Sequence, residues 1–194
     1  MIELLVVVGL TAVIAAIAIP MMANTLGNFR LSGDARSLSN ALSVAKMRAA
    51  SDFTQTRLFV DLDDRTYHIE EYRRSGTPGW VSATGSTNLS QSDAFGFGVV
   101  STPPPSTQAT IGQAAACLDG SGKVIGGSAC VVFNSRGIPV EPSPDMSLPT
   151  GAPTGVDAVY VTDGTAVYGV TVSATGLIRL WRTGPKATAA WVLQ

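Results

Sequence analysis

The chain has 194 residues and an almost balanced charge, with 13 Lys and Arg residues against 14 Asp and Glu residues. This balance excludes the strong overall positive charge that is typical of nucleic-acid-binding proteins. Only 14% of the residues are charged, whereas Gly, Ser, Thr and Pro are frequent, a composition that favours an exported protein over a charged cytosolic one.

Residues 4–22 form an uncharged, mostly aliphatic run, and an acid, Glu3, stands directly before it. A helix of about nineteen residues rises about 28 Å, which is close to the hydrocarbon thickness of a bilayer. A secretory signal peptide is the alternative, but no Lys or Arg precedes the run and it is longer than the apolar part of such peptides. The run therefore predicts a single membrane-spanning helix. A carboxylate at its edge is costly to desolvate and indicates a partner or a function.

The helical pattern continues behind the run. Six small or aliphatic residues follow one another at steps of three and four, which draws one apolar stripe along a helix: Leu31, Ala35, Leu38, Leu42, Ala45 and Ala49. We therefore expect one helix from about Ile2 to about Ser51. Pro20 and Gly27 would bend it, with a kink or loosened turn near residues 16–20.

Short runs of strand-forming residues fill the rest of the chain. Residues 57–61 and 66–72 predict a hairpin, and residues 129–140 predict an apolar strand followed by a turn. Three further runs with tight turns between them predict an antiparallel meander: residues 158–162, 166–172 and 177–181. Proline-rich residues 101–110 and 140–155 are expected to be surface loops.

The predicted fold is therefore α+β, a long N-terminal helix, first transmembrane and then amphipathic, packed against an antiparallel β-sheet domain. Its expected parts are an apolar half of the helix (residues 1–22), an amphipathic half (residues 23–52) and a β-rich head (residues 53–194). About 140 residues follow the helix, which is enough for one hydrophobic core.

Cys117 and Cys130 are the two cysteines of the chain. A disulfide between them would close a loop of about fourteen residues and stabilise the fold by roughly 3 kcal/mol. An exported location is oxidising enough to keep that bond closed. Two free thiols or a metal-binding pair are the alternatives, and no histidine lies near them in the sequence.

Catalytic patterns are lacking in this sequence: it has no Ser/His/Asp spacing, no phosphate loop and no zinc pattern. Its one histidine, His68, falls in a predicted strand, where a packing or surface role is favoured over that of a general base. We expect no enzymatic activity and no cofactor. Asp61, Asp63 and Asp64 are either turn residues or calcium ligands, and the turn is favoured because no glutamate follows at the calcium-loop spacing.

Residues 2–20, IELLVVVGLTAVIAAIAIP, resemble the N-terminal helix of type IV pilins and of the pseudopilins of type II secretion. Glu3 matches the glutamate of that family, and Pro20 matches its helix-bending proline. A basic leader that ends in glycine precedes this helix in the family, so we expect the natural chain to begin earlier than Met1.

The order of the elements resembles the GspH/FimT group of minor pilins and pseudopilins. The shared features are a long helix, an early hairpin, a strand at Phe133 that leads into Arg136-Gly137, and a C-terminal hairpin. FimT-like members that bind DNA tend to carry Gly-Arg-x-Arg in that hairpin. Residues 176–179 here read Gly-Leu-Ile-Arg, so DNA capture is not favoured, and Arg179 and Arg182 remain the candidate ligand-binding residues.

The resemblance implies a structural subunit of a type IV pilus or a type II secretion pseudopilus, a minor or tip subunit that assembles through its N-terminal helix. Glu3 would neutralise the amino terminus of a neighbouring subunit, and small residues such as Gly9 would let helices approach closely. The implied partners are other pilin or pseudopilin subunits, the inner membrane, an assembly platform and a prepilin peptidase. The implied location is the bacterial inner membrane, single-pass, with the head in the periplasm, and then a pilus or pseudopilus.

Three alternatives remain open at the level of sequence. The chain could be a major pilin, a DNA- or substrate-binding minor pilin of an uptake system, or an unrelated membrane-anchored enzyme or lectin-like domain. Nucleic acid is a partner only in the second of these, and its binding would weaken with salt.

Overall fold

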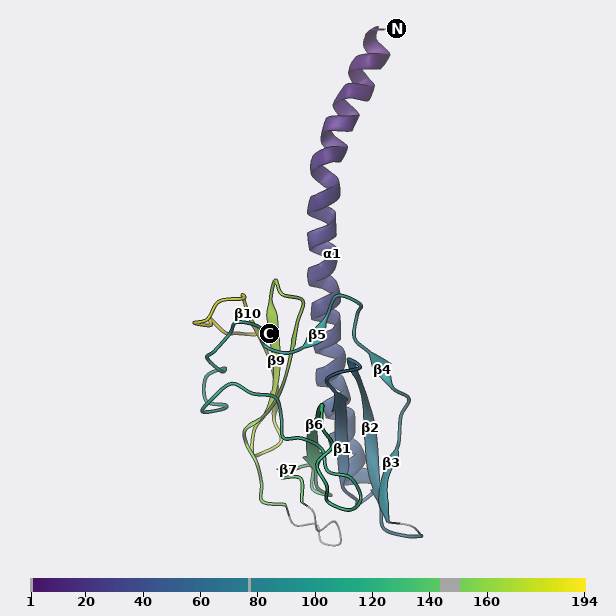
Figure 1. Ribbon diagram of the computed structural model, residues 1–194, viewed down its shortest axis with the longest axis vertical. Helices are drawn as coiled ribbons and strands as arrows, with labels where there is room; N and C mark the ends of the chain where they lie inside the picture. Colours follow the sequence, from purple (N-terminus) through teal and green to yellow (C-terminus); the bar gives the residue numbers. More distant parts are fainter. Residues whose placement is uncertain (1, 77, 144–150) are drawn as a thin grey trace.

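The computed structural model describes residues 2–76, 78–143 and 151–194, and within the helix it leaves out the side chains of residue 5 and residues 19–25. A single long helix carries a head of two antiparallel sheets at its C-terminal half (Figure 1). The α+β class is therefore as predicted, and the strands of the head form two sheets.

Helix α1 spans Ile2–Ser51 without interruption, with the bounds that the apolar run and the stripe predict. The loosened turn expected near Pro20 does not break it, although the helix curves in its N-terminal part (Figure 1). The side chain of Pro20 lies outside the described residues. The helix ends where Phe53 adopts a left-handed φ of 50°, a conformation that cannot continue a right-handed helix.

The first sheet, here sheet A, has the strand order β3-β2-β1-β6-β7, and β4 also pairs with β2. Its antiparallel β1–β2 hairpin confirms the hairpin predicted from the sequence. The strands are β1 (Thr56–Asp61), β2 (Thr66–Arg73), β3 (Gly79–Ser82), β4 (Thr87–Asn88), β6 (Ser128–Phe133) and β7 (Pro139–Val140).

The second sheet, here sheet B, has the order β11-β10-β9-β8-β5, and its three central strands form the predicted meander. The strands are β5 (Ala94–Phe95), β8 (Asp157–Thr162), β9 (Val167–Val172), β10 (Ile178–Thr183) and β11 (Val192–Leu193). Strand β7 is the last strand of sheet A, and its outer edge pairs with residues 152–154 through an isolated bridge between Val140 and Pro153. Strand β8 pairs with β5 and β9, so the strands divide into two sheets.

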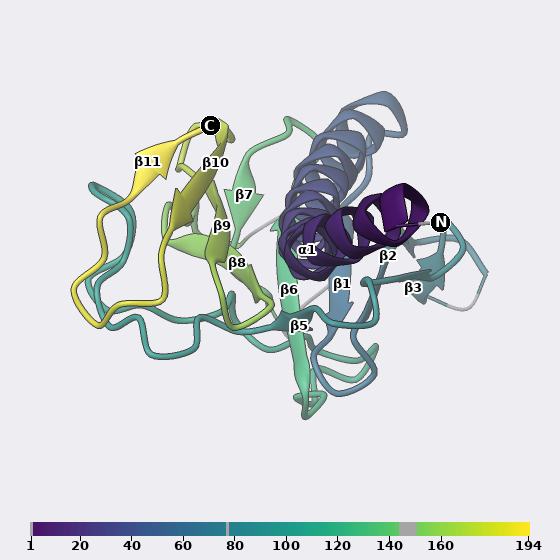
Figure 2. The ribbon, with the colours of Figure 1, turned by 90° about the horizontal axis from the view of Figure 1, so that it is seen from above.

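The core lies where α1 meets both sheets. All six residues of the predicted stripe are fully buried, and α1 contacts strands of sheet A (β1, β2, β6) and of sheet B (β8, β9, β10). Figure 2, seen from above, shows the two sheets next to each other around the helix. One apolar face of one helix therefore holds the two sheets together.

The predicted loops are surface segments in the part of the chain that the structure describes. Residues 101–110 contain no strand, and an isolated bridge between Val140 and Pro153 ties the ends of the second loop. Residues 144–150 of that loop lie outside the described residues.

Candidate functional site

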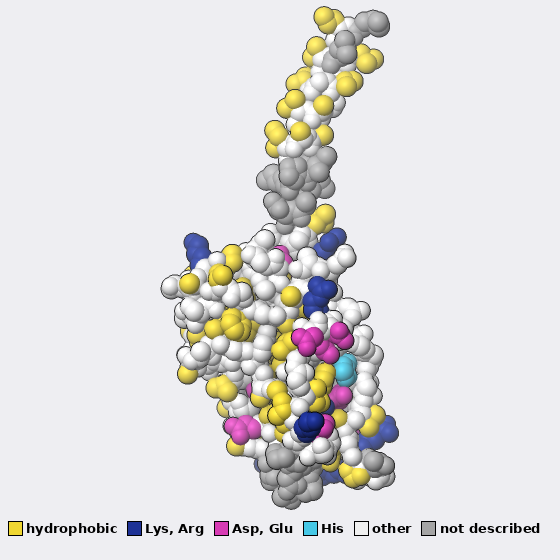
Figure 3. All heavy atoms as spheres, viewed as in Figure 1, with side chains coloured by type: hydrophobic (Ala, Val, Ile, Leu, Met, Phe, Trp, Pro, Cys, Tyr) yellow, Lys and Arg dark blue, Asp and Glu magenta, His cyan; other side chains and the backbone are white. Residues whose placement is uncertain are grey.

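The N-terminal half of α1 projects beyond the head and is apolar on its surface. Figure 3 shows hydrophobic side chains along this segment, whereas the charged side chains gather on the head. Ile2 is 80% exposed, Leu4 70% and Ile17 67%. Apolar surface of this extent on an isolated helix calls for an apolar partner, either lipid or protein.

Glu3 lies in the first turn of this segment, where a negative side chain interacts favourably with the helix dipole. Its side chain is exposed. Gly9 lies on the open surface of the same segment, because an added Cβ would meet nothing within 4 Å. Both residues are therefore accessible to another helix, and the assembly roles predicted for Glu3, Gly9 and Pro20 stay predictions.

No helix within the described residues combines the length and the apolar character needed to cross a membrane. Residues 19–25, which overlap the end of the predicted span, lie outside the described side chains.

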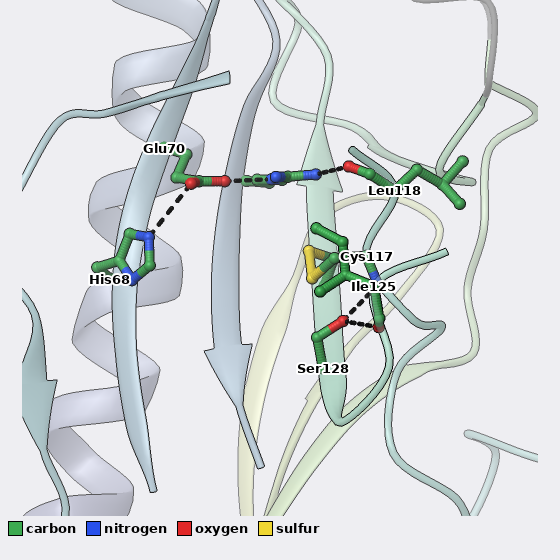
Figure 4. The surroundings of a disulfide bond; sticks show 8 residues. His68, Glu70, Cys117, Leu118, Ile125 and Ser128 are labelled. Atoms are coloured by element: carbon green, nitrogen blue, oxygen red, sulfur yellow. Dashed lines mark hydrogen bonds and ion pairs between the residues drawn. A yellow bond between two sulfur atoms is a disulfide. The ribbon is translucent and has the colours of Figure 1, made fainter. Parts of the chain in front are cut away.

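The predicted disulfide is confirmed, since Cys117 and Cys130 are bonded and their Cα atoms lie 5.0 Å apart. Figure 4 shows how the bond is held: the Ser128 hydroxyl accepts a hydrogen bond from the Cys117 amide and donates one to the Ile125 carbonyl. Both sulfurs are buried in a small second core on the face of sheet A opposite α1. The bond thus fixes the 117–130 loop to β6.

A largely buried ion pair lies beside the disulfide, and no pattern in the sequence predicts it. The Nε of Arg57 lies 2.5 Å from Oε2 of Glu70, and its Nη1 donates to the Leu118 carbonyl at 2.6 Å. The guanidinium also lies 4.1 Å from the centre of the Trp80 ring. Burial lowers the pKa of Arg57, and the charge of Glu70 opposes that change. Arg57 therefore anchors the 117–130 loop and β2 to β1.

His68 has a packing role. Its ring stacks on Phe59 with centroids 5.0 Å apart, and its Nε2 lies 3.2 Å from Oε1 of Glu70. Figure 4 shows the side chains of His68 and Glu70 pointing toward each other. These contacts agree with the interpretation of His68 as a packing residue in a strand.

The acidic turn between β1 and β2 uses its first aspartate as a structural group. Oδ1 of Asp61 accepts hydrogen bonds from the amides of Asp63 and Asp64 at 3.1 and 2.9 Å, which is the geometry of an Asx turn. In the described part of the chain, no three acidic, histidine or cysteine side chains gather to hold a metal ion. The geometry therefore favours the turn interpretation.

Arg179 and Arg182 both lie on β10 and are exposed. They are three residues apart, and because strand side chains alternate, they point to opposite faces of sheet B. The guanidinium of Arg182 lies 5.8 Å from the centre of the Tyr168 ring. The structure therefore does not bring the two candidate ligand-binding arginines together.

Two buried aspartates were also missed at the level of sequence, Asp93 and Asp157. Asp93 is fully buried close to Asp34 of α1, and Oδ1 of Asp93 accepts the Ser92 hydroxyl. Burial, together with the neighbouring Asp34 and Asp163, raises the pKa of Asp93 to about 6. Asp157 is the first residue of β8, at the end of that strand away from Asp93, and it lines a cavity there. Only the tertiary fold decides which aspartates are buried, so composition carries no signal for either.

The chain matches no protein-family model and no curated protein. Two solved structures of the minor pseudopilin EpsH, from the type II secretion system of Vibrio cholerae, are similar in arrangement. One is 14% identical, with a TM-score of 0.44, and the match covers 78% of this chain and 95% of that one. The other is 13% identical, with a TM-score of 0.44 and coverage of 84% and 96%. Neither is close enough to transfer a function, so the proposal below rests on this chain's own residues.

Proposed function

We propose that this chain is a pilin-like structural subunit, which joins a type IV pilus or a type II secretion pseudopilus through the N-terminal half of α1. One observation carries the proposal: this half of α1 projects from the head with exposed aliphatic side chains, whereas the second half is buried in the head. The spacing of Glu3, the apolar run and Pro20 adds the pilin-type sequence pattern.

The energetics favour association of this segment. Burying one aliphatic side chain contributes roughly 2 kcal/mol, and many lie exposed along the projecting segment, among them Ile2, Leu10 and Ile14. Before assembly, lipid can cover the same apolar surface of the projecting segment. The proposed sequence of states is therefore a subunit stored in the inner membrane with its head in the periplasm, and then a subunit packed in a filament.

Glu3 gives the association its register. A carboxylate that enters an apolar filament core without a partner is strongly destabilised. The amino terminus of a neighbouring subunit would supply the opposite charge, so that subunits in register are favoured over subunits out of register. A prepilin peptidase and an assembly platform are the corresponding partners for processing and insertion.

We assign the chain a minor position in the filament rather than the main shaft. Support comes from the order of elements in the head: the β1–β2 hairpin, the β6 strand with Phe133 that leads into Arg136-Gly137, and the C-terminal β9–β10 hairpin. Both sheets and the disulfide give this head a rigid core. Its role is structural rather than enzymatic.

The test is Glu3→Ala expressed from the native locus, with the exposed head variant Asp64→Asn as the matched control. Membrane fractions and isolated filaments are then quantified by immunoblotting. We expect Glu3→Ala to reach the membrane at the level of the natural chain but to fall at least about tenfold in filaments. Without the carboxylate, no charge pair with the neighbouring amino terminus favours subunits in register over subunits out of register. Asp64→Asn should leave both fractions unchanged. Equal recovery of Glu3→Ala and the natural chain in filaments would contradict the proposed role of Glu3.

A further inference from the structure

A groove of about 530 Å³ lies between the C-terminal half of α1 and the start of β10. Its lining consists of Ser43, Lys46 and Met47 of α1 together with residues 175–178. Met47 is 62% exposed and Leu177 is 49% exposed, so apolar surface faces solvent here. Figure 2 shows β10 and β11 at the outer side of sheet B, away from sheet A.

The groove follows the edge of β10 rather than one face of the sheet. Leu177 and Ile178 are consecutive, so their side chains point to opposite faces of sheet B, and both line the groove. Ile178 packs against the core cluster that contains Leu42 of α1. The side chain of Ile178 therefore lies on the α1 face, and that of its neighbour Arg179 lies on the other face, where it is exposed.

The backbone of β10 is open at Ile178. The Leu177 carbonyl accepts the Ser173 amide at 3.0 Å, so Leu177 bonds toward β9. Bonding direction alternates along an antiparallel strand, so the N–H and C=O of Ile178 point away from β9. On that side β11 pairs with β10 further along, and the Gln194 amide donates to the Leu180 carbonyl at 2.9 Å. Within the described residues, no backbone group pairs with Ile178 on that side.

Two other sheet edges of the head are covered by the chain itself. On β8, the side chain of Gln113 accepts the Tyr160 amide at 2.9 Å and donates to the Tyr160 carbonyl at 3.0 Å. On β7, the bridge between Val140 and Pro153 covers the outer edge. The start of β10 has no such cover in the part of the chain that the structure describes. An uncovered strand edge is a template for pairing with another chain.

The charges beside this edge are positive. Lys46 lines the groove and donates to the Gly176 carbonyl at 2.8 Å, and Arg179 is exposed next to Ile178. The described lining of the groove contains no acidic residue. The edge therefore favours a partner that brings a carboxylate.

We propose that an extended segment of another polypeptide pairs antiparallel with β10 at Ile178 and adds a strand to sheet B. The N–H and C=O of Ile178 would exchange two hydrogen bonds with one residue of that segment. That residue is apolar, because its side chain lies on the same face as Ile178, beside α1. The residue before it is acidic, because it lies opposite Arg179 on the other face.

The proposal uses only residues of the head and does not depend on filament assembly. Its failure would leave the proposed function standing, and failure of the proposed function would leave this edge unchanged.

The experiment is an NMR titration of the isotope-labelled full chain in detergent micelles with the blocked peptide acetyl-Glu-Val-Thr-Val-Thr-amide. Its glutamate is placed opposite Arg179 and its first valine opposite Ile178. We expect saturable shifts of the Ile178 and Arg179 amides, and exchange of the Ile178 amide hydrogen at least about tenfold slower in the saturated complex, because that hydrogen enters a hydrogen bond.

Two altered peptides test the two parts of the recognition on the natural chain. N-methylation of the first valine removes the hydrogen that the Ile178 carbonyl would accept, and should weaken binding at least about tenfold. Lysine in place of the glutamate puts like charges opposite each other and should weaken binding about fivefold.

Three variants of the chain locate the site. Ile178→Pro removes the N–H at the open edge, where proline is tolerated in a strand, and should abolish saturation. Arg179→Gln should weaken binding of the glutamate peptide about fivefold and should not weaken binding of the lysine peptide. Arg182→Gln is the matched control, because it makes the same change on β10 where β11 covers the edge, and it should bind as the natural chain does.

Absence of saturation with the first peptide would overturn the proposal. Equal binding of the N-methylated peptide, or equal binding by Ile178→Pro and the natural chain, would also overturn it, since neither leaves the backbone pairing intact. If a short DNA duplex or a rise in protein concentration shifts these amides and the peptide does not, nucleic acid or a second copy of the chain occupies the edge and the proposal is wrong.

Discussion

Replacing Leu42 by alanine removes a side chain from the point where one helix joins two sheets. Leu42 is fully buried on the α1 stripe, and it belongs to the core cluster that includes Leu58 of sheet A and Val170 of sheet B. Truncation of a leucine in such a site costs the lost transfer energy and leaves a cavity, together about 3 kcal/mol. For a protein of this size that corresponds to a fall of about 6 to 12 °C in Tm.

Urea and thermal unfolding of the full chain in detergent micelles, followed by circular dichroism, measures this loss. Met47→Ala is the matched control on the same helix, since Met47 is 62% exposed, and it should change the free energy of unfolding by less than about 0.5 kcal/mol. A loss below about 1 kcal/mol for Leu42→Ala would refute the view that the stripe holds the two sheets together.

Three further predictions concern the head. Folding raises the pKa of Asp157 from its ordinary value of 3.8 to about 7, so the folded state holds the proton more tightly than the unfolded state. The free energy of unfolding should therefore fall by up to about 4 kcal/mol between about pH 4 and pH 7. Urea unfolding at several pH values measures this dependence on pH, and Asp157→Asn should remove it. The double variant Cys117→Ser/Cys130→Ser should lose roughly 3 kcal/mol in the same assay, and an unchanged unfolding midpoint would contradict the proposed contribution of the disulfide. Gly176→Ala places a Cβ 2.5 Å from a backbone carbonyl oxygen at a φ of 74° and should lower the free energy of unfolding by more than about 2 kcal/mol. Gly164 has a φ of 84° and open space around it, so Gly164→Ala should cost only the backbone strain of about 1 kcal/mol. Equal losses in the two variants would show that the carbonyl contact is unimportant.

Local periodicity made much of this fold predictable. The steps of three and four from Leu31 to Ala49 define the buried face of α1, because a helix places such residues in one line. The β1–β2 hairpin and the C-terminal meander follow in the same way from strand-forming runs separated by turn residues. The disulfide was predictable because the chain has two cysteines and its composition favours an oxidising compartment.

Contacts between distant segments were not predictable. The division into two sheets depends on which strand pairs with β8, and no local pattern encodes that choice. Arg57 and Asp157 are charged residues in strands, so sequence rules place them at the surface. The first is buried because Glu70 and the Leu118 carbonyl compensate its charge. The second is buried beside the cavity with one oxygen free, a state that the sequence of β8 alone cannot reveal.

The central claim is that the exposed apolar half of α1 exists to pack against other helices in a filament. The most direct measurement is the distribution of the natural full-length chain in its native host between the membrane and isolated filaments, quantified relative to the other filament subunits. The account predicts that the chain is recovered in the filaments at a low ratio to the main subunit. Recovery of the chain as a monomer in the membrane alone, under conditions in which filaments form, would contradict it.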